Sequence, residues 1–165
     1  LIGWAEESIV PDKKVSLAGQ FFERISEYVE SEITVTAMAV EADGEEMIMV
    51  SADVIKCEDW MMELIRVEFD SYGTGMDSKK LMVSATHTHT SHVMSPRKRK
   101  QTNVPSTTKI LEEFLPAGKE YTELVTPDGT VMTPAEAGEF VCHKIALAAK
   151  KAAEAAKAAE AEKTN

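Results

Sequence analysis

The residues KLMVSATHTHTSH (80–92) decide how the rest of this sequence is interpreted. An apolar run at 81–83 predicts a buried strand that passes into small residues. The strand ends in three of the four histidines of the chain, His87, His89 and His92. Because His87 and His89 are two residues apart, an extended backbone points both imidazoles to the same side. The segment therefore predicts a metal or acid/base site, and the alternative is a polar strand end with surface histidines.

The chemistry of imidazole suits such a site. A neutral imidazole is a good zinc ligand and a general base near neutral pH. A hydrolytic zinc site usually has three protein ligands and a position left open for water. The segment supplies two or three of them, so Asp53 or a residue elsewhere in the chain would have to complete the set.

The elements before the histidines predict a mixed sheet. Residues 33–40 are rich in β-branched side chains, the pair at 43–44 is Asp-Gly, and 47–52 is nearly continuously apolar. These residues predict an antiparallel hairpin whose second strand is buried on both faces. The apolar spacing over 58–72 predicts a helix that stops at the following glycines.

Strand, helix and strand with short links form a βαβ unit, whose strands pair in parallel. Asp53 and His87 then lie at the same carboxyl edge of the sheet, where open α/β folds bind ligands. Asp53 either holds a histidine or a metal there or caps the helix that follows. The expected fold class is α/β, a mixed sheet with a βαβ unit, flanking helices and a long C-terminal helix.

The second half of the chain changes in character. Residues 95–108 predict an exposed loop, whose basic run at 97–100 we interpret as solvated, the alternative being a localisation or nucleic-acid signal. A short helix is expected at 109–115. The turn residues TPDG (126–129) predict a small hairpin between 121–125 and 130–132.

A long helix is expected to start at Thr133, which caps it, with Pro134 in the first turn and Glu136 completing a capping box. The last 18 residues, from 148 on, are almost only Ala, Lys and Glu, so we expect a solvated helical extension or a disordered tail. The chain then divides into an α/β domain at 1–147 and a tail at 148–165.

Composition narrows the classes of function. The formal charge of −10 over 165 residues argues against general affinity for nucleic acid or anionic membranes. No apolar run reaches the roughly 20 residues of a transmembrane helix. The first residues lack a secretory signal, so a cytoplasmic protein is expected, or a secreted one if a leader has been removed. Cys57 and Cys142 are expected to be reduced, with one disulfide as the alternative.

The histidine segment carries a family resemblance. Residues 84–90, SATHTHT, resemble the S-A-T-H-T-H-S motif in the amino-terminal catalytic domain of the neutral/alkaline (non-lysosomal) ceramidase family. VSLAGQ (15–20), Arg24 and VSAD (50–53) follow in the family's order. The resemblance covers roughly residues 1–145 and looks closest to bacterial ceramidase-domain proteins of uncertain substrate.

This resemblance implies a zinc amidase that splits an N-acyl sphingosine, or another small-molecule or lipid amide, into an acid and an amine. By the family pattern His87 would bind zinc and His89 would contact the reacting amide. We take His89 and His92 as catalytic candidates. Arg24 is the candidate for binding an anionic group of the substrate, or else it forms a surface ion pair.

Two departures limit the resemblance. The family's other zinc ligands, a histidine, a glutamate and a tyrosine, come from well downstream, where this chain has only His143 in different surroundings. The chain is also shorter than the family's catalytic domain, so we expect a fragment or truncated relative with an incomplete zinc site. The two hypotheses are a ceramidase-like zinc amidohydrolase domain and a noncatalytic binding or scaffold protein that keeps the fold.

Overall fold

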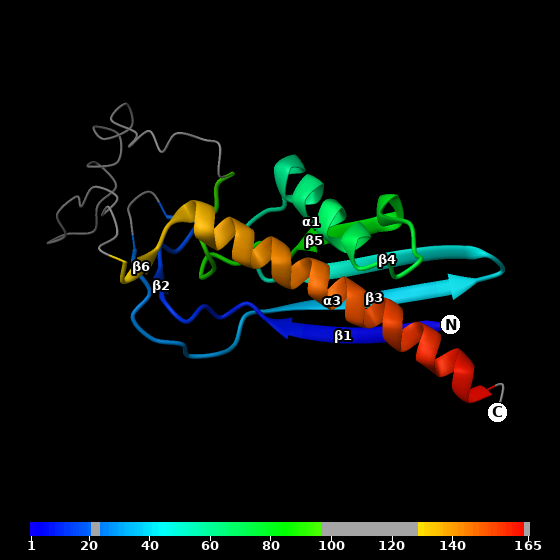
Figure 1. Cartoon of the computed structure of the whole chain (residues 1–165). Coiled ribbons are helices and arrows are strands. Elements are labelled where there is room, and N and C mark those ends of the chain that lie inside the picture. Colours follow the sequence, from blue (N-terminus) through cyan, green and yellow to red (C-terminus); the bar gives the residue numbers. More distant parts are fainter. Residues whose placement is uncertain (21–23, 97–128, 164–165) are drawn as a thin grey trace, which may run out of the picture.

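A computed structural model describes residues 1–20, 24–96 and 129–163, and it shows a four-stranded mixed sheet with two helices on one face (Figure 1). The order across the sheet is β1-β3-β4-β5. The bounds are Ile2–Ser8 for β1, Thr34–Ala42 for β3, Glu45–Ala52 for β4 and Leu81–Ala85 for β5. The predicted α/β class is confirmed.

The β3–β4 hairpin forms where the sequence predicts it. Asp43 and Gly44 both have positive φ, 54° and 78°, as the central pair of a tight two-residue hairpin turn requires. The two strands pair antiparallel from Val35 opposite Ala52 to Ala42 opposite Glu45.

The βαβ unit is also confirmed. Helix α1 (Asp59–Ser71) and the short 3₁₀ helix η1 (Ser78–Lys80) connect β4 to β5, and these two strands pair in parallel. The expected burial of both faces is wrong, however, because Met47 on β4 is 43% exposed and Met82 on β5 is 52% exposed. Both helices lie on the other face, and β5 is an edge strand.

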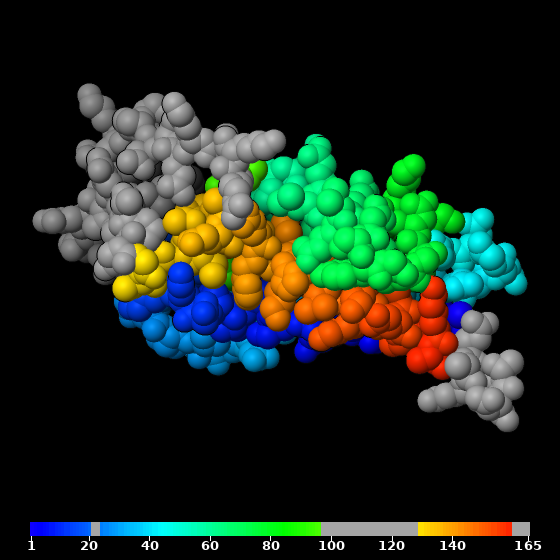
Figure 2. Space-filling view, viewed as in Figure 1, coloured from blue at the N-terminus to red at the C-terminus, as the bar shows by residue number. Residues whose placement is uncertain are grey.

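Helix α3 (Pro134–Lys163) runs along the whole sheet beside α1, as Figure 2 shows from the helical side. Its start is the predicted capping box. The Thr133 amide donates to Glu136 Oε2 at 2.7 Å, and the Glu136 amide donates to Thr133 Oγ1 at 3.2 Å.

The alanine-rich end of α3 is helical as expected, but the idea that it is solvated is wrong. Its buried side chains are all small: Ala148, Ala149, Ala152, Ala153 and Ala156. They allow a close approach to β1, a strand that we did not predict. A Cβ atom on Gly3 would lie 2.1 Å from the carbonyl oxygen of Ala152. The backbones of α3 and β1 therefore lie in direct contact at Gly3, and the space between them admits alanine side chains on α3.

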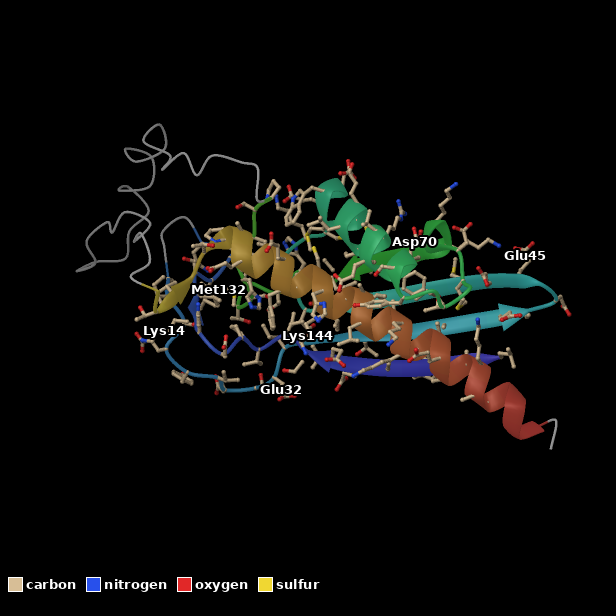
Figure 3. All side chains as sticks on the ribbon, viewed as in Figure 1. Lys14, Glu32, Glu45, Asp70, Met132 and Lys144 are labelled. Carbon is tan, nitrogen blue, oxygen red and sulfur yellow. The ribbon has the colours of Figure 1, made fainter. Side chains whose placement is uncertain are left out.

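One buried charge lies in this helix–sheet interface. Glu7 on β1 is 9% exposed and accepts from Lys151 and, at 2.8 Å, from Lys144, which Figure 3 labels on α3. Burial by itself would raise the pKa of Glu7, but the hydrogen bonds and charges of the two lysines lower it overall.

A second, two-stranded sheet lies beside the first. Strand β2 (Lys14–Val15) pairs in parallel with β6 (Val131–Met132), and Figure 3 labels Lys14 and Met132 where they meet. The other half of the hairpin predicted around 126–129 lies outside the described residues. So do the predicted helix at 109–115 and the basic run at 97–100.

Two further expectations concern cysteines and membranes. Cys57 and Cys142 are free thiols, and burial raises the pKa of Cys142 to about 12. Among the helices that the structure describes, none combines the length and the apolar character that crossing a bilayer requires.

Candidate functional site

The histidine segment lies at the carboxyl edge of the parallel strands, as the topology predicts. The amide of Thr86 donates to the Ala52 carbonyl at 3.0 Å, and the amide of His87 donates to that of Val54, also at 3.0 Å. The residues that follow β5 are thus hydrogen-bonded to the end of β4 and to the residues that follow it. This pairing brings Asp53 and His87 to one edge of the sheet.

Asp53 links β3 to the end of β5 through hydrogen bonds and does not contact an imidazole. Its Oδ2 accepts from the Thr34 amide at 2.9 Å, and its Oδ1 accepts from the Thr86 hydroxyl at 3.0 Å. It does not cap α1 either, because the N-cap of that helix is Glu58. Asp53 therefore acts through Thr86, the residue before His87.

His87 has φ at 62°, in the left-handed region that residues other than glycine seldom adopt, although Asn, Asp and His do so more often than the rest. Such strain of about 1–2 kcal/mol persists where surrounding contacts hold it, often at functional sites. Here the Nδ1 atom lies 2.7 Å from the carbonyl oxygen of Ile55. Because a carbonyl can only accept, Nδ1 of His87 carries the proton.

His89 is held in the same way from the other side. Its Nδ1 lies 2.9 Å from the carbonyl oxygen of Gly19, so this atom too carries the proton. The Arg24 guanidinium donates through Nη2 to the His89 carbonyl at 2.6 Å. Among the described residues Arg24 forms no ion pair, and its observed contact positions the histidine loop.

The two rings form an exposed pair. Their centroids are 5.2 Å apart and their planes meet at 71°. Since both Nδ1 atoms are protonated and bonded to backbone carbonyls, the lone pair of each Nε2 is available, and no described residue hydrogen-bonds to it. A histidine that binds zinc through one nitrogen almost always donates the other N–H to a carbonyl, carboxylate or water. The pair is prepared to bind a metal or to accept a proton.

His92 has a different environment. It is fully buried, its Nδ1 lies 3.1 Å from the Ser91 hydroxyl, and its ring centroid lies 6.0 Å from that of Phe140. Its Nε2 has no hydrogen-bond partner among the described residues. Burial lowers the pKa of His92 to about 4, so the ring is neutral at physiological pH.

The fourth histidine lies on the helical side. Nδ1 of His143 on α3 is 2.5 Å from Glu68 Oε1 on α1, and the Tyr72 hydroxyl donates to the same oxygen at 2.6 Å. Within residues 1–20, 24–96 and 129–163, no three His, Cys, Asp or Glu side chains assemble as a metal site. The described residues thus supply a pair of imidazoles and no third ligand.

Sequence reasoning missed the two carbonyls that fix the rings. Nothing in the sequence marks Ile55 as a partner of His87, because the contact uses backbone. Gly19 carries a weak signal: its φ is 90°, and a Cβ atom there would lie 2.3 Å from Nδ1 of His89. A glycine shortly before Arg24 is compatible with such a close approach, but the sequence does not identify its partner.

The fold defines the class of protein: an α/β domain with a mixed sheet, a βαβ unit and a histidine pair at the carboxyl edge of two parallel strands. The crystal structure of neutral ceramidase from Pseudomonas aeruginosa is similar, with a TM-score of 0.62 and 14% sequence identity over 93% of this chain. A structure described as ceramidase complexed with C2 matches with the same values. The chain spans 21% of the length of each of these chains.

At this identity the likeness shows a shared fold. No protein-family model matches the sequence, and no curated protein matches it. The resemblance noted in the sequence is therefore supported at the level of the fold.

Proposed function

We propose that this chain is a ceramidase-like amidohydrolase domain that acts on an N-acyl amide with zinc as its cofactor. The proposal is supported by the similar hydrogen bonding of His87 and His89. Each ring has Nδ1 on a backbone carbonyl, and neither Nε2 has a partner among the described residues. The likeness in fold to neutral ceramidase agrees with it. Since the chain spans a fifth of that protein, its activity and substrate are proposals here.

The chemistry divides between the two rings. His87 would bind zinc through Nε2, with the Ile55 carbonyl holding the ring in the required tautomer. When bound, zinc would supply Lewis-acid polarisation of the amide carbonyl and a water with lowered pKa. Nε2 of His89 can accept a hydrogen bond or, when protonated, donate one to the oxygen on which charge develops.

The surrounding residues position this pair. Arg24 holds the His89 carbonyl, and its remaining guanidinium donors are the candidate contact for an anionic group of the substrate. Buried His92 would support the loop rather than touch the amide. Zinc ligands beyond His87 would have to come from residues that the structure does not describe or from other polypeptide.

Metal stoichiometry tests the proposal. The protein should retain zinc after dialysis against zinc and then buffer, and His87→Ala should lose it. His143→Ala is the matched control, since His143 is an exposed histidine on the helical side. Zinc retained equally by His87→Ala would contradict the assignment. Hydrolysis of a fluorescent N-acyl sphingosine would then be measured for the zinc-loaded protein, with His89→Ala expected to lose turnover while it retains metal.

One observation favours a second candidate, a noncatalytic protein that keeps the fold for binding or as a scaffold. The described residues bring together two imidazoles and no third metal ligand. The absence of bound zinc and of turnover in a correctly folded protein would favour this candidate.

A further inference from the structure

Arg24 is a partly buried cation that lies beside the candidate catalytic pair. Its side-chain hydrogen bond among the described residues runs from Nη2 to the carbonyl oxygen of His89, at 2.6 Å, and this acceptor is uncharged. The Nε atom of Arg24 is buried and has no hydrogen-bond partner in the same part of the chain. Removing a charge from water is costly unless an opposite charge compensates it, so the guanidinium is suited to an anionic ligand.

The absence of an ion pair at Arg24, within the described residues, does not reflect a shortage of acids. The chain has 28 Asp and Glu residues against 18 Lys and Arg. Several described lysines do pair with glutamates, namely Lys56, Lys80, Lys144, Lys150 and Lys151. Arg24 is therefore available to an anion that does not belong to the described part of the chain.

Backbone hydrogen bonds fix Arg24 at the site. The Leu17 amide donates to the carbonyl oxygen of Arg24 at 2.7 Å, and Leu17 also pairs with His92 in an antiparallel bridge. The segment that carries Leu17 thus lies between Arg24 and the histidine loop. Because backbone and guanidinium are both held, Arg24 should lose little conformational freedom when a ligand binds.

We propose that Arg24 binds a carboxylate on the amine part of the substrate, which makes the substrate an N-acyl amino acid rather than an uncharged N-acyl sphingosine. This inference rests on the proposed amide hydrolysis for the identity of the reacting bond. A guanidinium can donate two parallel N–H groups to a carboxylate. Arginine has five N–H donors, and the observed bond to the carbonyl of His89 leaves most of them available.

The carboxylate of the released acid fits Arg24 less well. That carboxylate forms at the carbon that reacts, which the proposed chemistry assigns to His87 and to Nε2 of His89. Arg24 contacts the backbone of His89 and not its ring. In addition, the carboxylate of the released acid does not exist before cleavage, whereas one on the amine part contributes to binding from the start.

Equilibrium binding to the metal-free protein tests the proposal, with N-octanoylglycine and its methyl ester as probes that differ by one charge. We expect the acid to bind about tenfold more tightly than the ester, and Arg24→Gln should abolish this preference. Arg66→Gln is the matched control, because Arg66 also has a buried Nε without a described partner but lies on α1. A preference that persists in Arg24→Gln would reduce Arg24 to a structural role and overturn the proposal.

Octanoate tests which part of the substrate carries the charge. Its carboxylate is at the acyl end, so Arg24→Gln should leave its affinity unchanged, and a loss as large as that for N-octanoylglycine would overturn the assignment to the amine part. These measurements involve neither zinc nor turnover. Failure of the proposed function would therefore leave the preference for the acid intact, whereas equal binding of acid and ester by the parent protein would contradict this inference alone.

A further measurement does not depend on the folding of a variant. In the parent protein, saturation with N-octanoylglycine should shift the Nε–H resonance of Arg24 and leave that of Arg66 in place. The methyl ester should shift neither resonance. An Arg24 resonance that does not move with the acid would overturn the proposal.

Discussion

The carbonyl oxygen of Gly19 lies 2.9 Å from Nδ1 of His89, and at φ 90° Gly19 leaves no room there for a side chain. Seventy positions separate the two residues in the sequence. The contact joins the segment around β2 to the histidine loop, and it determines which nitrogen of His89 is free. The orientation of the imidazole therefore depends on a glycine that takes no part in chemistry.

Gly19→Ala should displace the His89 ring, because the new Cβ would lie 2.3 Å from Nδ1 and the left-handed backbone strains the alanine as well. We expect the proposed amide hydrolysis to be lost, and to fall by a larger fraction than the free energy of unfolding does. Gly44→Ala is the control, since Gly44 has φ 78° and open space around it. Similar destabilisation of both variants, with activity lost only at Gly19, would confirm the role; equal activity in both would contradict it.

The tautomers of His87 and His89 can be observed directly. Since each Nδ1 donates to a carbonyl, the metal-free neutral rings should both carry the proton on Nδ1 and not on Nε2. Nitrogen chemical shifts of ¹⁵N-labelled histidine at alkaline pH distinguish the two forms. His143, which contacts a carboxylate, is an internal reference on the helical side. Protonation of Nε2 in either ring would show that its lone pair is not available to a metal.

Asp53 should matter to the site through Thr86. Asp53→Asn keeps the shape but weakens the acceptors of the Thr34 amide and the Thr86 hydroxyl, and we expect a loss of about 1–2 kcal/mol in unfolding free energy. Thr86→Val removes only the hydroxyl contact and should lower the unfolding free energy by a smaller amount. A double variant whose loss is smaller than the sum of the single losses would demonstrate the coupling, measured by urea unfolding. Strict additivity would mean that the two residues act separately.

The parts of the fold that could be predicted carry their signals locally. The hairpin follows from an Asp-Gly turn, and the βαβ unit follows from two apolar runs that flank a helical spacing. Strand β1 was not predicted because two of its inward positions are Gly3 and Glu7, which do not resemble core residues. Their suitability depends on α3, more than a hundred residues away, so it appears only when the two elements are placed together.

In the histidine site, too, some features follow from local sequence and others depend on distant segments. The edge position of His87 follows from topology, whereas the burial of His92 does not, since its neighbours Leu17 and Phe140 come from distant segments. Likewise, the end of α3 resembles a solvated helix because alanine is compatible with both water and a close backbone contact. Contacts made through backbone atoms leave little trace in side-chain identity.

His92 should make stability depend on pH. Its pKa is about 4 in the folded protein, below the usual 6.5, so the unfolded chain binds a proton at a higher pH than the folded one. Stability is therefore lost as pH falls from about 6.5 to 4, by roughly 3 kcal/mol in total. Urea unfolding across this range should show the decline, and His92→Leu should remove it.

The carboxylate of Glu7 and a control variant allow the contribution of His92 to be separated from that of other titrating groups. Glu7, whose pKa is lowered from 4.5, loses its contribution only at more acidic pH, so the interval from 6.5 to 4.5 reports on His92. His143→Gln serves as a control for an exposed histidine. If the stability of His92→Leu falls as steeply as that of the parent protein between pH 6.5 and 4.5, the burial of this ring does not govern the pH dependence.

The alanine face of α3 should tolerate no larger side chain. Ala156 is 2% exposed and lies against Gly3, where a Cβ would approach the Ala156 amide nitrogen to 2.2 Å, so Ala156→Leu must push the helix away from β1. We expect a loss of about 1–3 kcal/mol in unfolding free energy. Ala158→Leu is the matched control two residues away, because Ala158 is exposed and leucine is also a good helix former. Thermal unfolding of both variants distinguishes the cases: equal melting temperatures would mean that the end of α3 does not pack on the sheet, whereas a lower value for Ala156→Leu alone would show that it does.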